Sequence, residues 1–200
     1  MRTISIVTFF CLALWSCNTT TEKQTKPVTE PKEDTAVYAD SQKQSESIII
    51  GPKFFEYDAI DYYTIALDDQ EVSAISRNQS KSETDSFKNG IVRGTIPKNT
   101  GDLAFLEQME KIGYEKINIA PSKFKSMDSI FVEKTATNHE VYACIHVYRD
   151  ILIFKKSNKV VGTAKICFHC MGQQIKGPKT NTRNFVQNED FDRLETLLKQ

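Results

Sequence analysis

Two long apolar runs on either side of a short polar loop constrain the fold more than any other feature of this sequence. The first run is VYACIHVYRDILIF (residues 141–154) and the second is VVGTAKICF (residues 160–168). The loop between them, KKSNK, contains Ser157-Asn158. β-Branched and aromatic residues dominate both runs, which is typical of strands joined by a tight turn. We therefore predict a long β-hairpin over about residues 141–168 at the centre of a sheet.

Both faces of the first predicted strand carry apolar side chains. Leu152 and Phe154 share one face and Ile151 and Ile153 the other, because side chains alternate along a strand. A sheet that is apolar on both faces needs a covering layer on each. We expect helices to supply these layers.

Two segments have the apolar spacing of amphipathic helices. The first begins at Asp102, the expected N-cap, and ends at Gly113, with an apolar stripe formed by Phe105, Leu106, Met109 and Ile112. The second lies at the carboxyl end. There Asn188 is the expected cap, and the stripe consists of Phe191, Leu194, Leu197 and Leu198.

Shorter patterns complete the expected topology. We predict strands over residues 48–50, 57–67 and 90–97, and a loop over residues 76–89. Residues 122–133 fit either a helix or a strand. The chain is thus predicted to be α+β, with a largely antiparallel sheet whose central hairpin is covered by two or three helices. Residues 48–200 are expected to form a single domain.

The amino terminus has the layout of a secretory signal. Residues 3–16 are nearly all apolar or small, follow a positive charge at Arg2, and lead directly to Cys17 and a polar tract. As a helix this stretch would reach about 21 Å, less than the roughly 30 Å hydrocarbon core of a bilayer. We expect residues 1–16 to be a signal peptide that is removed.

The residues Leu14-Trp15-Ser16-Cys17 resemble the lipobox of bacterial lipoproteins, in which a small residue precedes the cysteine that becomes acylated. The hairpin that ends in ICFHC (residues 166–170) also resembles uncharacterised lipoproteins of Bacteroidota, a group for which no activity is implied. The resemblance implies that Cys17 carries the acyl chains that attach the protein to a lipid bilayer. In that class, an aspartate directly after the acylated cysteine commonly marks retention in the inner membrane. Residue 18 is an asparagine, so the resemblance implies the outer membrane, with the domain facing the periplasm. The alternative is an ordinary signal peptide or an uncleaved anchor, in which the cysteine occurs by chance.

The segment between the lipobox and the domain has the composition of a disordered tether. Residues 17–47 are rich in Ser, Thr and charged residues, and contain too few apolar residues to offset the entropy of ordering. About thirty residues of flexible chain reach roughly 30 Å. We expect residues 18–47 to hold the domain clear of the membrane.

Three cysteines remain in the predicted domain, which is an odd number for a protein outside the cytoplasm. One hairpin register places Cys144 opposite Cys170, and a slipped register places it opposite Cys167. Either pair could form a structural disulfide and leave one free thiol. Both pairings remain open at this point.

Two chemical roles compete with the structural one. Cys167-Phe168-His169-Cys170 resembles the active-site motif of periplasmic thiol oxidants of the thioredoxin fold, although no βαβ unit precedes it. Alternatively, five residues supply ligand types suited to zinc or copper: Cys144, His146, Cys167, His169 and Cys170. If residues 167–170 continue a strand, His169 and Cys170 point to opposite faces, which would divide these metal ligands between the two faces of the sheet.

Charge and motifs exclude several further classes. The 26 basic and 26 acidic residues cancel, so the chain lacks the net field of a general nucleic-acid binder. The sequence contains no glycine-rich phosphate loop, His-Glu-x-x-His or Gly-x-Ser-x-Gly motif. Arg149-Asp150 within an apolar run is expected to form an ion pair or end the strand, or else to anchor an anion.

The sequence therefore predicts a lipoprotein of the cell envelope that binds an unknown ligand or envelope protein and is not an enzyme. It implies no cofactor for this function. The alternative is a periplasmic thiol-redox or metal-handling protein that uses Cys167 and Cys170.

Overall fold

The predicted hairpin forms the middle of a five-stranded antiparallel sheet in the computed structural model, which describes residues 50–135, 144–185 and 189–200. Its strands are β5 (Asp150–Lys156) and β6 (Lys159–Cys167). Between them, Ser157 and Asn158 both have positive φ, 48° and 61°, as a two-residue hairpin turn requires. The turn and the apolar runs together fix the register, which pairs Leu152 with Ala164.

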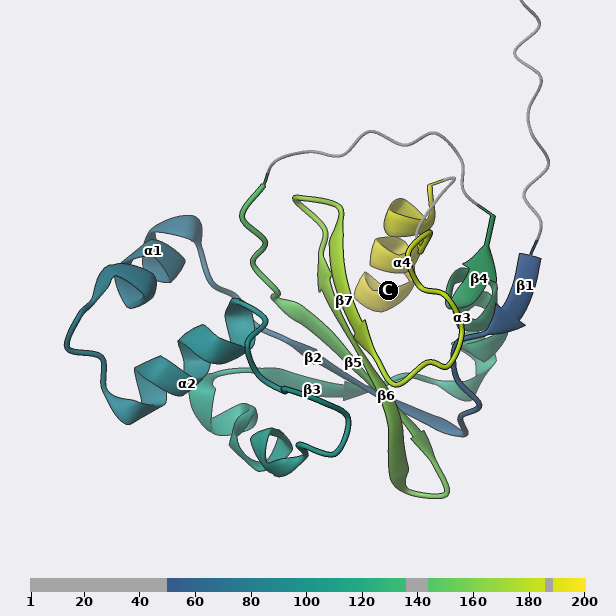
Figure 1. Ribbon diagram of the computed structural model, residues 1–200, viewed down its shortest axis with the longest axis horizontal. Coiled ribbons are helices and arrows are strands. Elements are labelled where there is room, and N and C mark those ends of the chain that lie inside the picture. Colours follow the sequence, from purple (N-terminus) through teal and green to yellow (C-terminus); the bar gives the residue numbers. More distant parts are fainter. Residues whose placement is uncertain (1–49, 136–143, 186–188) are drawn as a thin grey trace, which may run out of the picture. The chain divides into compact units, whose positions relative to one another are not determined.

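Three further strands complete this sheet in the order β3-β2-β5-β6-β7 (Figure 1). They are β2 (Ala59–Thr64), β3 (Glu115–Asn118) and β7 (Gly172–Lys176). Every neighbouring pair is antiparallel. A separate antiparallel pair consists of β1 (Ile50–Lys53) and β4 (Val132–Lys134). The predicted α+β class with a largely antiparallel sheet is confirmed.

One face of the sheet is covered by α1 (Asp69–Arg77) and α2 (Glu83–Val92), together with the 3-10 helices η1 (Ala104–Gln108) and η2 (Glu110–Ile112). Ile151 and Ile153 of β5 point to this side. They pack with buried residues of the covering elements: Val72, Ile91, Val92, Phe105, Met109 and Ile112.

The other face is covered by α3 (Phe124–Ile130), which the 3-10 helix η3 (Pro121–Lys123) precedes, and by α4 (Asp190–Lys199). Leu152 and Phe154 point to this side, as their alternation with Ile151 and Ile153 predicts. The core here is strongly aromatic. The Phe154 ring stacks on Phe55 with centroids 4.3 Å apart and meets the edge of Phe131 at 4.9 Å.

Several expected elements are wrong, and their local chemistry explains why. The expected loop over residues 76–89 contains the end of α1 and most of α2, which Ser82 caps by accepting from the Asp85 N–H at 3.0 Å. The expected strand over residues 90–97 is the end of α2 and the turn that follows it. The expected helix over residues 102–113 is the pair η1 and η2. It does end at Gly113, whose φ is +98°.

Other boundaries move less. The first strand is β1, and it includes Gly51-Pro52 instead of ending there. Residues 122–133 contain both a helix, α3, and the start of a strand, β4. Residues 144–149 are not strand, so the first hairpin strand is half its predicted length. The expected cap Asn188 lies outside the described residues.

The predicted signal, Cys17 and tether also lie outside the described residues. The described residues all belong to one compact unit, Gln44–Gln200. Within them, no helix has the length and apolar character needed to cross a bilayer.

Candidate functional site

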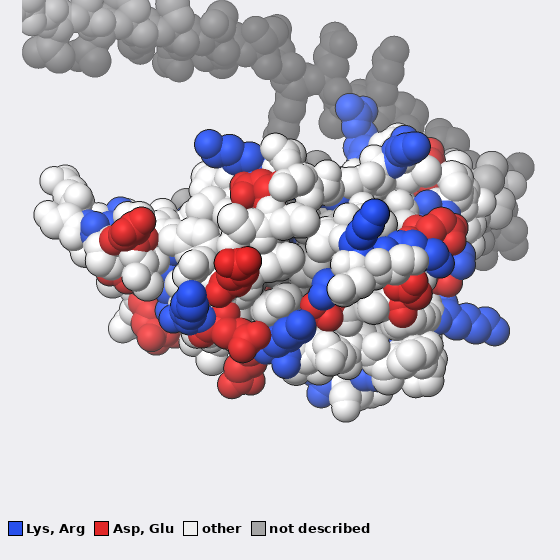
Figure 2. Space-filling model, turned by 90° about the horizontal axis from the view of Figure 1, so that it is seen from below, with Lys and Arg blue, Asp and Glu red and all other residues white. Residues whose placement is uncertain are grey.

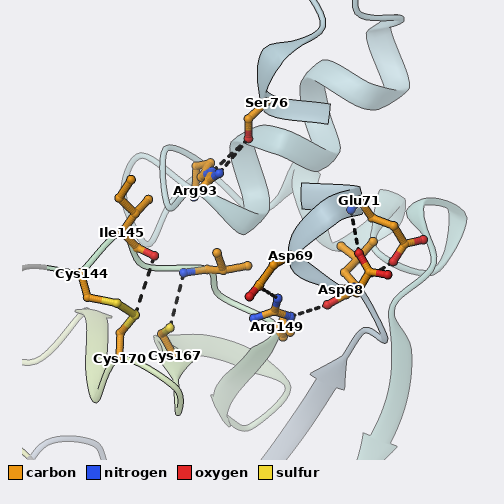
Figure 3. Close-up of polar contacts among 12 residues, drawn as sticks. Asp68, Asp69, Glu71, Ser76, Arg93, Cys144, Ile145, Arg149, Cys167 and Cys170 are labelled. Carbon is orange, nitrogen blue, oxygen red and sulfur yellow. Dashed lines mark hydrogen bonds and ion pairs between the residues drawn. A yellow bond between two sulfur atoms is a disulfide. The ribbon is translucent and has the colours of Figure 1, made fainter. Parts of the chain in front are cut away.

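The three domain cysteines meet at one end of the sheet (Figure 3). Cys144 and Cys170 form a disulfide across 26 residues of sequence, with their Cα atoms 5.9 Å apart. Cys167, at the end of β6, is a buried free thiol. Of the two pairings that the sequence left open, the structure contains the one between Cys144 and Cys170.

The segment 144–149 leaves the sheet because its backbone groups have other partners. The Val147 N–H points at the Cys167 sulfur at 3.4 Å, and the Tyr148 N–H donates to the carbonyl of Val92 at 2.9 Å. The Tyr114 hydroxyl donates to the Tyr148 carbonyl at 2.8 Å. The segment therefore bridges the end of α2 and the sheet, and the disulfide fixes its first residue.

A cleft of about 250 Å³ lies where this segment faces α1 and the end of α2. Its walls combine the disulfide with charged and apolar side chains. The lining residues are Asp69, Val72, Arg93, Cys144, Ile145, Val147, Arg149, Cys167, His169 and Cys170. Figure 3 shows the cysteines on one side of the segment and Arg93 with Ser76 on the other. The cleft thus brings two arginines and a histidine next to three sulfur atoms.

Arg149 enters the cleft from the residue before β5. Its Nε donates to the Leu67 carbonyl at 2.6 Å, and its Nη2 lies 2.6 Å from Oδ1 of Asp69. The Arg149 side chain is 24% exposed, whereas that of Asp69 is 83% exposed. The backbone contact therefore positions the guanidinium, while its acidic partner lies in solvent.

Arg149 and Asp150 do not pair with each other. Asp150 is buried and accepts hydrogen bonds from the Tyr62 hydroxyl at 2.5 Å and the Thr64 hydroxyl at 3.3 Å. Burial is the main cause that raises the pKa of this carboxyl above its usual value. The strand-end position expected for Asp150 is correct, but its partners are side-chain hydroxyls and not backbone groups.

Arg93 enters the cleft from the C-cap position of α2. Its Nε and Nη2 both donate to Oγ of Ser76 in α1, at 3.1 and 2.9 Å. Ser76 in turn donates to Oδ1 of Asn89 at 2.9 Å. Among the described residues, no carboxylate lies within ion-pair distance of Arg93. The side chain is half-buried, so its charge is only partly hydrated and meets only a neutral hydroxyl.

Capping residues position α1 at the mouth of the cleft. Asp68 accepts from the Glu71 N–H at 2.8 Å, and the Glu71 carboxylate accepts from the Asp68 N–H at 2.8 Å. This reciprocal capping box starts the helix at Asp69. Asp68 is therefore the cap of the helix, and Asp69 is its first residue.

The expected metal ligands are only partly brought together. Cys144 and Cys170 are oxidised, and the His146 ring packs over Gly172, where an added Cβ would lie 2.3 Å from it. His169 is exposed at the rim of the cleft. Within residues 50–135, 144–185 and 189–200, no group of three or more His, Cys, Asp or Glu side chains is placed to hold a metal.

A buried lysine near the cleft was missed by the sequence interpretation. Lys165 of β6 is 1% exposed, and its Nζ donates to the carbonyls of Ile91, at 2.7 Å, and of Ile96. Desolvation lowers its pKa to about 7, with a smaller contribution from Lys176. Its ammonium nitrogen lies 5.9 Å from the Tyr148 ring centroid. The sequence feature that could have identified this buried lysine is its position between Ala164 and Ile166 in an apolar strand.

Arg93 is a charged cleft residue that the sequence interpretation missed, because it lay within an expected strand. The signals that could have found it are the cap Ser82 and the apolar pair Phe87 and Ile91, four residues apart. Together they predict a helix that ends just before Arg93.

The face in Figure 2 carries acidic and basic side chains side by side. This mixture agrees with the equal numbers of the two charges in the sequence. The sequence matches no family model, and neither a curated protein nor a solved structure matches the chain. Its function must therefore be inferred from the residues themselves.

Proposed function

We propose that this chain is a lipoprotein of the bacterial cell envelope whose folded domain binds a ligand in the cleft beside the disulfide. Acylated Cys17 attaches it to the outer membrane, and a tether of about thirty residues holds the domain in the periplasm. The observation that carries the binding role is the cleft itself, which contains two arginines, of which Arg93 has no acidic partner among the described residues.

The contacts around the cleft favour binding over catalysis. The Cys167 sulfur faces the Val147 N–H, and no hydrogen bond joins it to a histidine or carboxylate of the described chain. An adjacent base of this kind is one of the usual ways in which a nucleophilic cysteine is activated. The disulfide and the bonds of Tyr148 hold the cleft wall in one place, which lowers the entropy lost on binding.

The lipid attachment is tested by labelling. Cells that express the full chain are grown with a radioactive or alkyne-bearing fatty acid and then fractionated. We expect the label and the protein in the outer membrane, and we expect Cys17→Ala to lose the label while Cys11→Ala keeps it. Label in the Cys17→Ala protein, or an acylated protein in the inner membrane, would contradict this proposal.

A second candidate is thiol-redox chemistry, because the free thiol and the disulfide line the same cleft. In this reaction the Cys167 thiolate attacks the Cys170 sulfur, a Cys167–Cys170 bond forms, and Cys144 leaves as a thiolate. The exchange conserves electrons and needs no outside oxidant. In the reduced protein, the three thiols and His169 would instead offer zinc or copper ligands at the cleft.

Disulfide mapping separates the two candidates. The chain from residue 18 onward is incubated at pH 8, alkylated and digested. A redox protein should contain both the Cys144–Cys170 and the Cys167–Cys170 peptides, and Cys167→Ser should abolish the second. A binding protein should contain only the first.

A further inference from the structure

We infer that the ligand of the cleft is a small organic acid, with its carboxylate between Arg93 and Arg149 and its apolar part against Val72, Val147 and Ile145. This inference rests on the proposed use of the cleft as a binding site and adds the chemical class of the ligand. It does not depend on the lipid anchor.

Arg93 has unused capacity to bind an anion. A guanidinium carries five N–H donors, and here only Nε and Nη2 are bonded, both to the same neutral hydroxyl. Within the described residues, Nη1 has no acceptor. A charged, half-buried donor gains most from an anionic acceptor, because charge-assisted hydrogen bonds are about twice as strong as neutral ones. The Ser76 contact orients the guanidinium but leaves its charge uncompensated.

Arg149 supplies a second donor on the same cleft. The Leu67 carbonyl holds its Nε, so the guanidinium is positioned before a ligand arrives. Asp69 occupies only Nη2 and is itself 83% exposed. An exposed ion pair of this kind contributes little to stability. A ligand carboxylate can therefore bind at Nη1 or replace Asp69 at little cost.

The remaining walls and the size of the cleft limit the ligand. Val72 and Val147 are buried apolar residues, whereas Ile145 is 77% exposed, unusual for a large apolar side chain. An apolar group lying on Ile145 would remove that surface from water. The volume of about 250 Å³ is slightly below the range of about 300 to 1,000 Å³ typical of drug-sized ligands. A short-chain acid fits these limits better than a nucleotide or a peptide does.

The test uses residues 18–200 with the disulfide intact and calorimetric titration with sodium hexanoate. Acetate tests the contribution of the apolar part, and hexanol tests that of the charge. Inorganic phosphate tests the other common anion. We expect hexanoate to bind more tightly than acetate, phosphate or hexanol.

Variants then locate the site. Arg93→Gln and Arg149→Gln should each weaken hexanoate binding about 10- to 100-fold, as the loss of a charge-assisted bond predicts. Arg77→Gln, at the exposed end of α1, is the matched control and should not change the affinity. Arg93→Lys keeps the charge without the planar fork and should give an intermediate affinity. A urea unfolding curve of each variant establishes that it is folded.

Three results would overturn the inference. If hexanol binds as tightly as hexanoate and the arginine variants keep that affinity, the cleft is a binding site but not for an acid, and the proposed function survives. If phosphate alone binds and needs both arginines, the ligand class is wrong. If no probe binds, both the inference and the proposed role of the cleft fail.

Discussion

Removing the disulfide should destabilise the domain by an amount that the structure allows us to estimate. In the double variant Cys144→Ala/Cys170→Ala, the cross-link across 26 residues is lost. The chain-entropy relation for a loop of this length gives about 3.5 kcal/mol at 25 °C. That value corresponds to a decrease in Tm of about 7–14 °C for a domain of this size.

The native contacts suggest that nearly all of this loss should be observed. Cys144 and Ile145 are exposed, so the disulfide is the main constraint on the start of the segment. Val147 and Tyr148 are buried, and the hydrogen bond from Tyr148 to Val92 does not involve a sulfur. The variant should therefore release residues near 144 and keep the rest of the fold.

The assay is urea unfolding of residues 18–200, followed by circular dichroism, with and without reductant. The wild-type protein should lose about 3.5 kcal/mol when reductant is added, and the double variant should not respond to reductant. A loss below about 1 kcal/mol in the variant would refute the reasoning, since it would place the cross-link outside the cooperative unit. A mapped disulfide that contains Cys167 would refute the pairing itself.

Three further predictions concern buried polar groups and packing. Lys165 has a pKa of about 7 in the folded protein and 10.5 in its free state. Above pH 7 the unfolded chain therefore binds more protons than the folded protein, and the free energy of unfolding should rise by at most about 1.4 kcal/mol per pH unit. In urea unfolding at pH 7, 8 and 9, Lys165→Met should flatten this rise. Asp190→Asn should cost about 3–5 kcal/mol, because it leaves the buried Lys134 ammonium without its carboxylate. Arg193→Ala removes a half-exposed partner of the same Asp190 and should cost about 1 kcal/mol or less in the same assay. Equal losses of stability in the Asp190→Asn and Arg193→Ala proteins would contradict this prediction. Gly162→Ala should lower Tm, because its Cβ would lie 1.9 Å from the Phe55 ring, and overpacking costs about 1–3 kcal/mol. The exposed Gly101→Ala should leave Tm nearly unchanged in the same thermal scan.

The central part of the fold could be predicted because its apolar pattern is long and unambiguous. Residues 150–156 alternate between two cores, and the sheet is buried on both faces as that alternation requires. The stripe of the carboxyl-terminal helix was also predicted: Phe191, Leu194 and Leu198 are buried, and Leu197 is partly buried against the same core. In both cases, burial of apolar surface determines the local structure.

Elements with little buried surface were missed for the opposite reason. Val72 is the only buried residue of α1, so the apolar pattern there is too weak to indicate a helix. The information lay in capping, through Asp68 with Glu71 and Ser82 with Asp85. β3 is exposed along its whole length, and β7 is partly exposed, so hydrogen bonding to a neighbouring strand defines them more than hydrophobicity does.

The cysteine pairing could not be decided from the sequence because it depends on where the first strand begins. The register set by Asp150 and Ile166 would have carried residue 144 past Cys170 if the strand had continued. The strand instead starts at Asp150, since the backbone of Tyr148 bonds to the end of α2. Only a tertiary contact from a missed helix places Cys144 beside Cys170.

The polar residues that interrupt the hairpin strands explain how the cleft is built. Lys165 binds the carbonyl of Ile91, in the last turn of α2, and Arg93 follows that turn directly. Arg149, just before β5, binds the carbonyl of Leu67, just before the cap of α1. Lys165 thus joins β6 to the end of α2, and Arg149 joins the residue before β5 to the start of α1, both near the cleft. These two charged residues are therefore best explained as groups that position the walls of the cleft, and the proposed binding site lies where the sequence departs from a purely apolar hairpin.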